Sequence, residues 1–434
     1  MSLLDRPAVN VGLLGLGTVG TGVYNILKKE AAEIERKTGV RLVMRHVCDK
    51  FISRDRQKIF PKSLFTRDPE DLLKDPSLHI LVELIGGLRP AEDILKRAIA
   101  GGKHVVTANK ALLAERGDFL FKQKSFGQTY VGIEASVCGA IPILKAIEES
   151  LASNNLTSVL GIVNGTCNYI LTQMTSQGMD FAEALAQAQA KGYAERDSRL
   201  DVEGIDSAHK LAVLARLAFR TRIPFGQIHI EGISKITSFD IQYAMEMGYA
   251  IKLLAIAKKT EAGLELRVHP TLLTAEHPLA SVKGVFNAVF VSADQAGDLL
   301  FYGRGAGMYP AASAVAGDIV DIAKRITVGD SRRGLFVEAE RRFPVIPVDQ
   351  LKSGYYLRFQ VMDRPEMLGR IAKALGQHHI SIRSVQQKQT HQSKSVPVVI
   401  LTYQALERDL RKALRIIDAQ KEVAQKTVVI RVES

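Results

Sequence analysis

The glycine-rich stretch near the N-terminus constrains the fold more than any other part of the sequence. An apolar segment at residues 9–14 leads directly into GLGTVG, and a helical apolar pattern follows at Val23, Ile26 and Leu27. A GxGxxG motif between a strand and a helix is typical of parallel sheets that bind dinucleotides. Backbone N–H groups at the helix N-terminus would face the pyrophosphate. The predicted cofactor-binding residues here are Gly15, Gly17, Thr18, Val19 and Gly20. The alternative is a glycine-rich turn without a ligand.

A second predicted strand, RLVMRHVCD, ends at Asp49. A carboxylate at this position suits the ribose hydroxyls of NAD. Lys50, Arg54 and Arg56 follow at once and would suit the 2′-phosphate of NADP, or they form a solvated loop. The preference between NAD and NADP therefore stays open.

Two further strands are predicted at residues 79–87 and 103–110, with the helix AEDILKRAIAGG between them. Alternating strands and helices predict an α/β fold with a Rossmann-type sheet. Open parallel sheets bind ligands at the carboxyl ends of their strands. Lys110 closes such a strand, so we expect it to face the crevice, although a surface lysine is the simpler alternative.

The composition limits the class of protein. A chain of 434 residues predicts two or three domains. No uncharged apolar run of about 18 residues occurs, so no membrane span is expected. Three widely spaced cysteines favour neither a disulfide framework nor a zinc site, and they fit a reducing cytoplasm. The net charge of +12 is spread along the chain without a nucleic-acid motif, which indicates a general affinity for anions.

Residues 192–210, GYAERDSRLDVEGIDSAHK, concentrate charge at the start of an apolar helix. Asp206 and Lys210 are one turn apart and therefore share a helix face. That face continues with Val213, Leu214 and Leu217. A solvated salt bridge would continue with polar residues, so we expect the two charges to point into a pocket.

Several of these stretches together resemble homoserine dehydrogenase, of the monofunctional bacterial type with a C-terminal ACT domain. They are the GxGxxG loop, ELIGG, TANK, EASVCGAIPI, NGTCNYIL and GYAERDSRLDVEGIDSAHK. The resemblance covers nearly the whole chain. Ser198 stands where the family has proline, and Cys167 where it usually has threonine. The resemblance implies NAD(P)-linked interconversion of L-homoserine and L-aspartate 4-semialdehyde, in threonine, methionine and isoleucine biosynthesis.

The chemistry of that reaction suits the charged residues. Hydride delivered to an aldehyde leaves a developing alkoxide, which needs a proton donor or a cation. Lys210 and Lys110 are the two candidates, and which of them moves the proton stays open. The resemblance implies that Glu195 binds the substrate amino group and that Asp206 binds near the reacting end. It also implies that Asp201 lines the substrate pocket, that Lys110 contacts cofactor and substrate, and that Lys210 is the proton donor.

The loop EASVCGAIP favours a packed strand end on its residues alone. The resemblance implies instead that this loop binds a structural sodium ion through backbone carbonyls and one acid. The implied metal ligands are Glu134, Val137, Gly139 and Ile141. Oxygen ligands of this kind suit a hard cation. Gly305, in the later stretch FYGRGAG, is predicted to allow close approach beside the nicotinamide.

The expected domains are a Rossmann domain at 1–145 completed by 306–328, an α+β catalytic and dimerisation domain at 146–305, a linker at 329–354 and an ACT domain at 355–434. The family's sheet domain implies a homodimer or homotetramer. In the tail, the predicted order βαββαβ is ferredoxin-like, with Leu368, Ile371 and Leu375 facing inward.

The ACT domain resemblance implies an amino-acid effector, and threonine is the predicted one. Glu366 replaces the glycine of the usual turn, so a dimerising module without a ligand is the alternative. Two other functions are alternatives for the whole chain. Aspartate-semialdehyde dehydrogenase needs an activated thiol, but Cys138 and Cys167 have no evident histidine partner. A non-catalytic sensor of NAD(P) and an amino acid would not need the complete set of acids and lysines.

Overall fold

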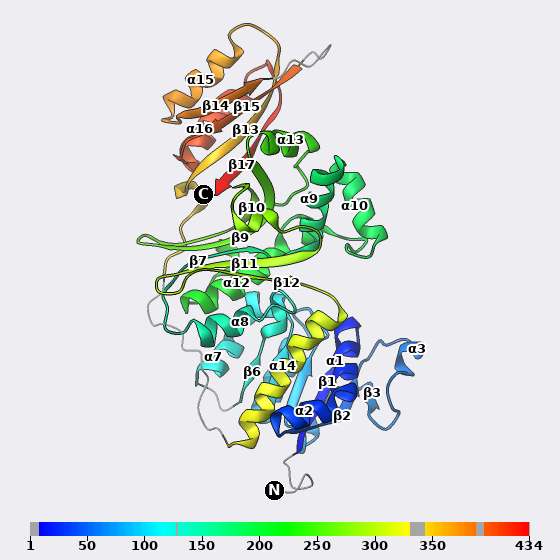
Figure 1. Cartoon of the computed structure of the whole chain (residues 1–434). Helices are drawn as coiled ribbons and strands as arrows, with labels where there is room; N and C mark the ends of the chain where they lie inside the picture. Colours follow the sequence, from blue (N-terminus) through cyan, green and yellow to red (C-terminus); the bar gives the residue numbers. More distant parts are fainter. Residues whose placement is uncertain (1–7, 127–128, 330–342, 388–394, 434) are drawn as a thin grey trace. The chain divides into compact units, whose positions relative to one another are not determined.

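The computed structural model describes residues 8–126, 129–329, 343–387 and 395–433. The chain forms two compact units (Figure 1). The first unit comprises Met1–Val159, His209–Phe225 and Phe286–Arg342, and the second comprises Leu160–Ala208, Gly226–Val285 and Phe343–Ser434. In the described part of the chain, no helix combines the length and the apolar character that a membrane crossing requires.

A parallel sheet forms the core of the first unit. Its order is β3-β2-β1-β4-β5-β6, the order of a Rossmann fold, so the predicted α/β class is confirmed. The strands are β1 (Ala8–Leu14), β2 (Arg41–Cys48), β3 (Phe65–Thr66), β4 (Ile80–Glu83), β5 (His104–Thr107) and β6 (Val131–Gly132). The order reverses between β1 and β4, and this is where such sheets bind ligands.

Helices cover the parallel sheet. Helix α14 (Met308–Thr327) packs against α1 (Thr18–Lys29), and both bury apolar side chains in one core with β1. The close approach of α14 to α1 requires Gly22, because a Cβ there would lie 2.9 Å from the Cβ of Ala312. The other helices of this region are α2 (Ala31–Thr38), α3 (Arg54–Gln57), α4 (Glu70–Lys74), α5 (Ala91–Ala100), α6 (Lys110–Arg116), α7 (Asp118–Phe126), η2 (Glu134–Ser136), α8 (Ile143–Lys145) and η3 (Ala146–Ser150).

Among the described residues, three neighbouring strands of the 11-stranded sheet have the order β12-β11-β7. They are β7 (Leu156–Ile162), β11 (Phe286–Ala293) and β12 (Gly297–Arg304). The hairpin of β11 and β12 is antiparallel and turns at Gly297, whose φ is 71°. Helix α12 (Ile205–Phe219) contributes residues to both units.

The second unit contains a mixed run of strands in the order β9-β10-β17-β13-β15-β14. These are β9 (Tyr249–Thr260), β10 (Gly263–Thr274), β13 (Lys352–Met362), β14 (Ile382–Gln387), β15 (Ser395–Thr402) and β17 (Val423–Glu433). The short strands β8 (His229–Ile230) and β16 (Ala405–Leu406) pair with β10 and β13. The remaining elements are α9 (Gly165–Gln177), α10 (Phe181–Ala190), α11 (Arg199–Val202), α13 (Ser238–Glu246), η4 (Phe225–Gln227), η5 (Pro278–Ser281) and η6 (Val348–Gln350).

The C-terminal part has the predicted βαββαβ order: β13, α15 (Met367–Gln377), β14, β15, α16 (Glu407–Asp418) and β17. One predicted core position is wrong, since Leu368 is 40% exposed. The buried face of α15 instead carries Met367, Ile371, Ala374 and Leu375, which follow the i, i+4, i+7, i+8 spacing of one helix face. Residues 330–342 of the predicted linker lie outside the described residues, and β13 begins at Lys352, inside the predicted linker range.

Candidate active site

The glycine loop after β1 has the geometry that a pyrophosphate needs. Gly15 has a φ of 98°, and a Cβ there would lie 2.6 Å from the carbonyl carbon of Leu84. A Cβ at Gly20 would lie 2.0 Å from the carbonyl oxygen of Gly15. A Cβ at Gly17 would meet nothing within 4 Å. Gly15 and Gly20 are therefore required by packing, whereas Gly17 leaves the loop open where α1 begins at Thr18, with Val19 next.

Asp49, predicted to contact the ribose, also supports this loop. Its Oδ2 accepts the N–H of Leu16 at 2.8 Å, and its Oδ1 accepts the N–H of Phe51 at 2.9 Å. A carboxylate has about four acceptor positions, so these two bonds leave capacity for a ribose hydroxyl. Asp49 thus fixes the glycine loop relative to β2.

Glu83 is a site residue that sequence reasoning missed. It ends β4, is fully buried, and accepts the N–H groups of Ile85 and Gly86 at 2.9 and 3.0 Å and the hydroxyl of Thr107 at 2.6 Å. Burial raises the pKa of Glu83, and the hydrogen bonds to Thr107 and the two backbone amides oppose that rise. The carboxyl group therefore joins the ends of two neighbouring parallel strands. The sequence signal that could have identified this contact is a polar residue at the end of each strand, Glu83 in ELIGG and Thr107 in TANK.

Asn109 completes this connection and places Lys110. Its Oδ1 accepts the N–H of Leu112 at 3.1 Å and so caps α6, while its Nδ2 donates to the carbonyl of Gly87 at 2.6 Å. Lys110 is the first residue of α6 and is half-buried. It therefore lies at the carboxyl end of β5, as predicted from its place after the strand.

In the second unit, Asn164 brings two predicted substrate acids together. Its Nδ2 donates to Oδ1 of Asp201 at 2.7 Å and to Oδ2 of Asp206 at 2.9 Å. Its Oδ1 accepts the N–H of Cys167 at 2.8 Å and caps α9. Asp206 is only 8% exposed, and Asp201 is half-buried. Two carboxylates held at one amide form an anionic patch suited to an ammonium group.

Cys167 contributes to the same loop without being a nucleophile. Its thiol donates to the carbonyl oxygen of Asp201 at 3.2 Å, and the side chain is fully buried. Cys48, Cys138 and Cys167 are all buried. Burial, with the charge of Asp49, raises the pKa of Cys48 to about 12, which keeps that thiol protonated.

Lys210 lies one turn after Asp206 on α12 and is 9% exposed. The predicted apolar face below it is confirmed, because Val213, Leu214 and Leu217 are 2% exposed or less. A lysine and an aspartate at the buried start of an apolar helix are not a solvated surface pair. This arrangement suits proton transfer next to a bound substrate.

The rest of the charged stretch is more exposed. Glu195 is exposed in the loop after α10, and its carbonyl oxygen accepts from Nε2 of Gln189 at 3.2 Å. Asp197 pairs with Arg199 at 2.6 Å, with both side chains in solvent. Ser198 has a φ of −93° and opens α11, so the helix starts here without the family's proline.

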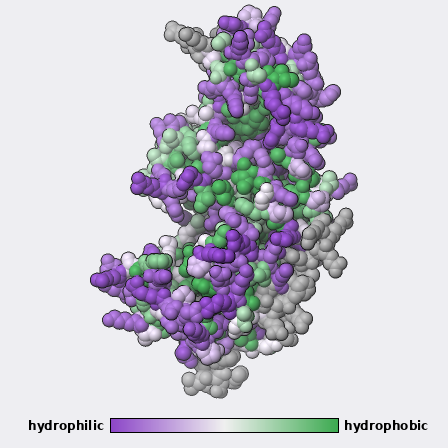
Figure 2. All heavy atoms as spheres, turned by 180° about the vertical axis from the view of Figure 1, so that it is seen from behind, coloured by the Kyte–Doolittle hydropathy of each residue, from purple (hydrophilic) through white to green (hydrophobic). Residues whose placement is uncertain are grey.

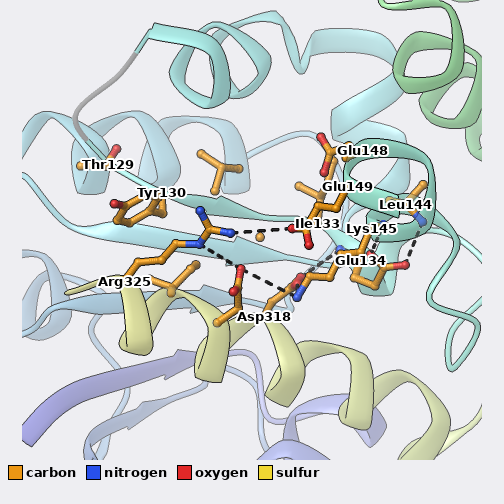
Figure 3. A pocket seen from close by; sticks show the side chains of 14 residues that line it. Thr129, Tyr130, Ile133, Glu134, Leu144, Lys145, Glu148, Glu149, Asp318 and Arg325 are labelled. Carbon is orange, nitrogen blue, oxygen red and sulfur yellow. Dashed lines mark hydrogen bonds and ion pairs between the residues drawn. The ribbon is translucent and has the colours of Figure 1, made fainter. Parts of the chain in front are cut away.

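Glu134 begins the loop predicted to bind sodium (Figure 3). Its carboxylate oxygens accept the N–H groups of Leu144 and Lys145 at 2.9 and 2.8 Å, and its own N–H donates to Asp318 at 2.9 Å. Lys145 Nζ lies 3.0 Å from Asp318. Burial, and then the charge of Asp318, raises the pKa of Glu134 to about 7. Glu134 and Asp318 thus lie close together, with Lys145 beside Asp318.

The loop that follows is tightly turned and meets the stretch around Gly305. Cys138 and Gly139 have positive φ values of 55° and 50°, between Val137 and Ile141. A Cβ at Gly139 would lie 2.6 Å from the carbonyl oxygen of Gly305. Among the described residues, no group of three or more His, Cys, Asp or Glu side chains could hold a metal. Backbone carbonyl oxygens in a loop of this kind suit a hard cation and not a transition metal.

Comparisons with known proteins agree with this geometry. The family model for homoserine dehydrogenase matches residues 142–320, that for the homoserine dehydrogenase NAD binding domain matches 15–132, and that for the ACT domain matches 355–422. The homoserine dehydrogenase of Neisseria gonorrhoeae is 44% identical over 98% of this chain and 99% of its own. That of Pseudomonas aeruginosa is 42% identical, with the same coverage.

A solved structure is similar over the same length. The crystal structure of a homoserine dehydrogenase from Thiobacillus denitrificans has a TM-score of 0.92 and 40% identity, and it covers 99% of each chain. The resemblance inferred from the motifs is thereby confirmed. The chain belongs to the homoserine dehydrogenase family and is, like its members, an NAD(P)-dependent oxidoreductase that acts on a CH–OH group.

Proposed function

We propose that this chain interconverts L-homoserine and L-aspartate 4-semialdehyde with Lys210 as the group that moves the proton. The observation that carries the assignment is the buried start of α12. There Asp206, held with Asp201 by Asn164, lies one turn before Lys210 on the same helix. In the reducing direction, a nicotinamide cofactor would supply the hydride when bound. Lys210 would then protonate the alkoxide oxygen on the former aldehyde carbon.

Asp201 and Asp206 hold the substrate in this proposal. Their carboxylates bind polar groups of homoserine, with Asp206 nearer the reacting end, and Glu195 approaches the α-ammonium from its exposed loop. Lys110 contacts both the cofactor and the substrate from the end of β5. The cofactor itself is held by Gly15, Gly17, Thr18, Val19 and Gly20, with Asp49 at the ribose and Gly305 beside the nicotinamide.

Replacement of each lysine separates these roles. Lys210→Ala is expected to lower kcat about a hundredfold or more, since general acid catalysis contributes roughly that much. NADPH affinity, measured by fluorescence titration, is expected to stay near that of the wild type. Lys110→Ala is expected to weaken both cofactor and substrate binding. Loss of activity in Lys210→Ala that is explained by weaker NADPH binding alone contradicts the assignment.

We also propose that the chain assembles as a homodimer or homotetramer through the strands of the catalytic region. On β12, Leu300 and Tyr302 are 44% and 55% exposed, and Tyr302 stacks on Phe286. Figure 2 shows hydrophobic side chains gathered among hydrophilic ones on one face of the molecule. Exposed aromatic and aliphatic groups on a sheet favour association with a second copy. Sedimentation velocity of the purified chain tests this, and a monomer at micromolar concentration rejects it.

A structural sodium ion at Glu134, Val137, Gly139 and Ile141 belongs to the same proposal. It is supported by the buried carboxylate of Glu134 and by the sharp turn at Cys138 and Gly139. The three widely spaced, buried cysteines fit a reducing compartment such as the cytoplasm. The domain bounds 1–145 with 306–328, 146–305, 329–354 and 355–434 remain our proposed division.

We propose threonine as an effector of the ACT domain. Glu366 adopts a left-handed φ of 73° at the N-cap of α15, a conformation that glycine adopts without strain. Its carboxylate is exposed and lies 3.6 Å from Arg370. L-threonine is expected to lower the rate of homoserine oxidation, and Glu366→Gly is expected to change the concentration required. An unchanged rate of the wild type at saturating threonine rejects the effector and leaves a module without a ligand.

A further inference from the structure

Arg431 is the centre of a buried ion network in the second unit. It lies on β17, the last strand of the ACT domain, and is 2% exposed. Its Nε and Nη2 donate to the two carboxylate oxygens of Glu407 at 2.9 and 2.7 Å. Its Nη1 and Nη2 donate to the carboxylate of Glu231 at 3.0 and 3.1 Å. One guanidinium thus binds two carboxylates, each through two hydrogen bonds, and Glu231 is the partner outside the ACT domain.

The segment that carries Glu231 packs directly against the loop of substrate acids. The N–H of Ile233 donates to the carbonyl of Val202 at 2.8 Å. A Cβ at Gly232 would lie 2.3 Å from that carbonyl oxygen and 2.5 Å from the Cα of Glu203. A Cβ at Gly204, whose φ is 84°, would lie 3.3 Å from the carbonyl of Glu231. Residues 231–233 are therefore closely packed against residues 202–204.

The position of residues 202–204 in the chain makes this contact relevant to function. They separate Asp201 from Asp206, the two acids that Asn164 brings together. We propose that Arg431 is a positioning residue for homoserine: through Glu231 and residues 231–233, the ACT domain's last strand sets the geometry of the substrate acids. The inference rests on the proposed role of Asp201 and Asp206 in binding substrate.

The strand β10 connects Arg431 to Glu231 through the backbone. β17 pairs in parallel with β10, with Arg431 opposite Thr271. The N–H of Glu231 donates to the carbonyl of Val268, on the same strand β10, at 2.8 Å. A shift of β17 relative to β10 would therefore move Arg431 relative to Glu231. Arg431, Glu231, β10 and the acid loop all belong to one compact unit.

The same unit offers a matched control. Arg358, on the ACT strand β13, donates from Nε and Nη2 to Asp240 at 2.7 and 3.1 Å. Its side chain is 10% exposed, and that of Asp240 is fully buried. This second pair also joins an ACT arginine to an acid outside the ACT domain. The acid of this pair, Asp240, lies on α13 and not within residues 231–233.

The test compares Arg431→Lys and Arg431→Met with Arg358→Lys and Arg358→Met in the full chain. Arg431 variants are expected to raise the KM for homoserine about tenfold, within the usual range of coupling between sites. The Kd for NADPH is expected not to change. Arg358 variants are expected to lose similar stability in urea while keeping the wild-type KM. Gly232→Ala leaves Arg431 in place but puts a methyl group 2.3 Å from the carbonyl oxygen of Val202, and it is expected to raise the KM as Arg431→Lys does.

Two results overturn the proposal. One is a folded Arg431→Lys protein whose homoserine KM stays within about twofold of the wild type, well below typical coupling. The other is an equal rise in KM for Arg358→Lys. If Arg431→Met does not fold, Arg431→Lys and Gly232→Ala decide the matter. Asp206→Asn tests the substrate role of Asp206 separately from the role of Arg431. If homoserine kinetics are unchanged in Asp206→Asn, both the substrate assignment and the coupling are wrong. If they are impaired in Asp206→Asn but normal in the Arg431 variants, only the coupling is wrong.

Discussion

His104 illustrates how a single buried residue adds a pH dependence to the stability of this protein. It begins β5, and its Nδ1 accepts the backbone N–H of Tyr130 at 2.8 Å. Burial, and then the charge of His79, lowers the pKa of His104 to about 4. The native ring is therefore neutral over the range in which a histidine in the unfolded chain, with a pKa of about 6.5, becomes protonated.

The sign of the effect follows from proton binding. Between about pH 6.5 and pH 4 the unfolded state binds a proton that the native state does not bind, so stability falls as the pH falls. His104→Asn retains an acceptor for Tyr130 without a titrating ring. We expect it to lose less stability than the wild type between pH 7 and pH 5 in urea unfolding. Burial also lowers the pKa of His269, so part of the pH dependence of stability remains in both proteins. Equal losses contradict this account of His104.

Asn164 shows why some site residues could not be predicted from the sequence. Its two carboxylate partners lie 37 and 42 residues further along the chain. No local periodicity relates positions so far apart. Asp206 and Lys210, in contrast, are one helical turn apart, so their shared face could be predicted from spacing alone. Glu83 and Thr107 were missed for the same reason as Asn164, since they meet across two neighbouring strands.

At the scale of elements, the glycines between β1 and α1 have two different roles, one in packing and one in cofactor binding. A Cβ at Gly20 would collide with the backbone of Gly15 at 2.0 Å, whereas Gly17 has open space around it. Gly20→Ala is therefore expected to lower the melting temperature of the Rossmann region. Gly17→Ala is expected to keep that temperature and to weaken NADPH binding, because its methyl group would occupy the approach to the pyrophosphate.

Thermal unfolding and NADPH titration of the two variants check this prediction. Equal effects on both measurements would mean that the glycines do not have separate roles. Local elements such as this one were predictable because GxGxxG, flanked by a strand and a helix, determines its own conformation. The exact face of α15 was not, because Leu368 and Met367 are equally apolar and only packing against the ACT sheet decides between them.

At the scale of the whole molecule, the pairing of β10 with β17 was the main feature that the sequence did not predict. The two strands are far apart in the chain, and their register places Leu272 opposite Val432. The sequence predicted a separate tail module, and each of its elements was found in order. The pairing nevertheless joins that module to the strands of the catalytic region in one compact unit. Long-range strand pairing of this kind depends on tertiary packing, which a single sequence does not reveal.

We propose that Asp206 and Lys210 on α12, together with Asp201 on α11, serve hydride transfer between homoserine and a nicotinamide cofactor. The most direct measurement follows nicotinamide absorbance when the purified chain meets L-homoserine with NAD or with NADP. We expect reduction that requires homoserine, yields aspartate 4-semialdehyde and is about a hundredfold or more slower in Lys210→Ala. The relative rates with NAD and NADP would identify the preferred cofactor. Clear binding of NADPH without any homoserine-dependent reduction would contradict the account.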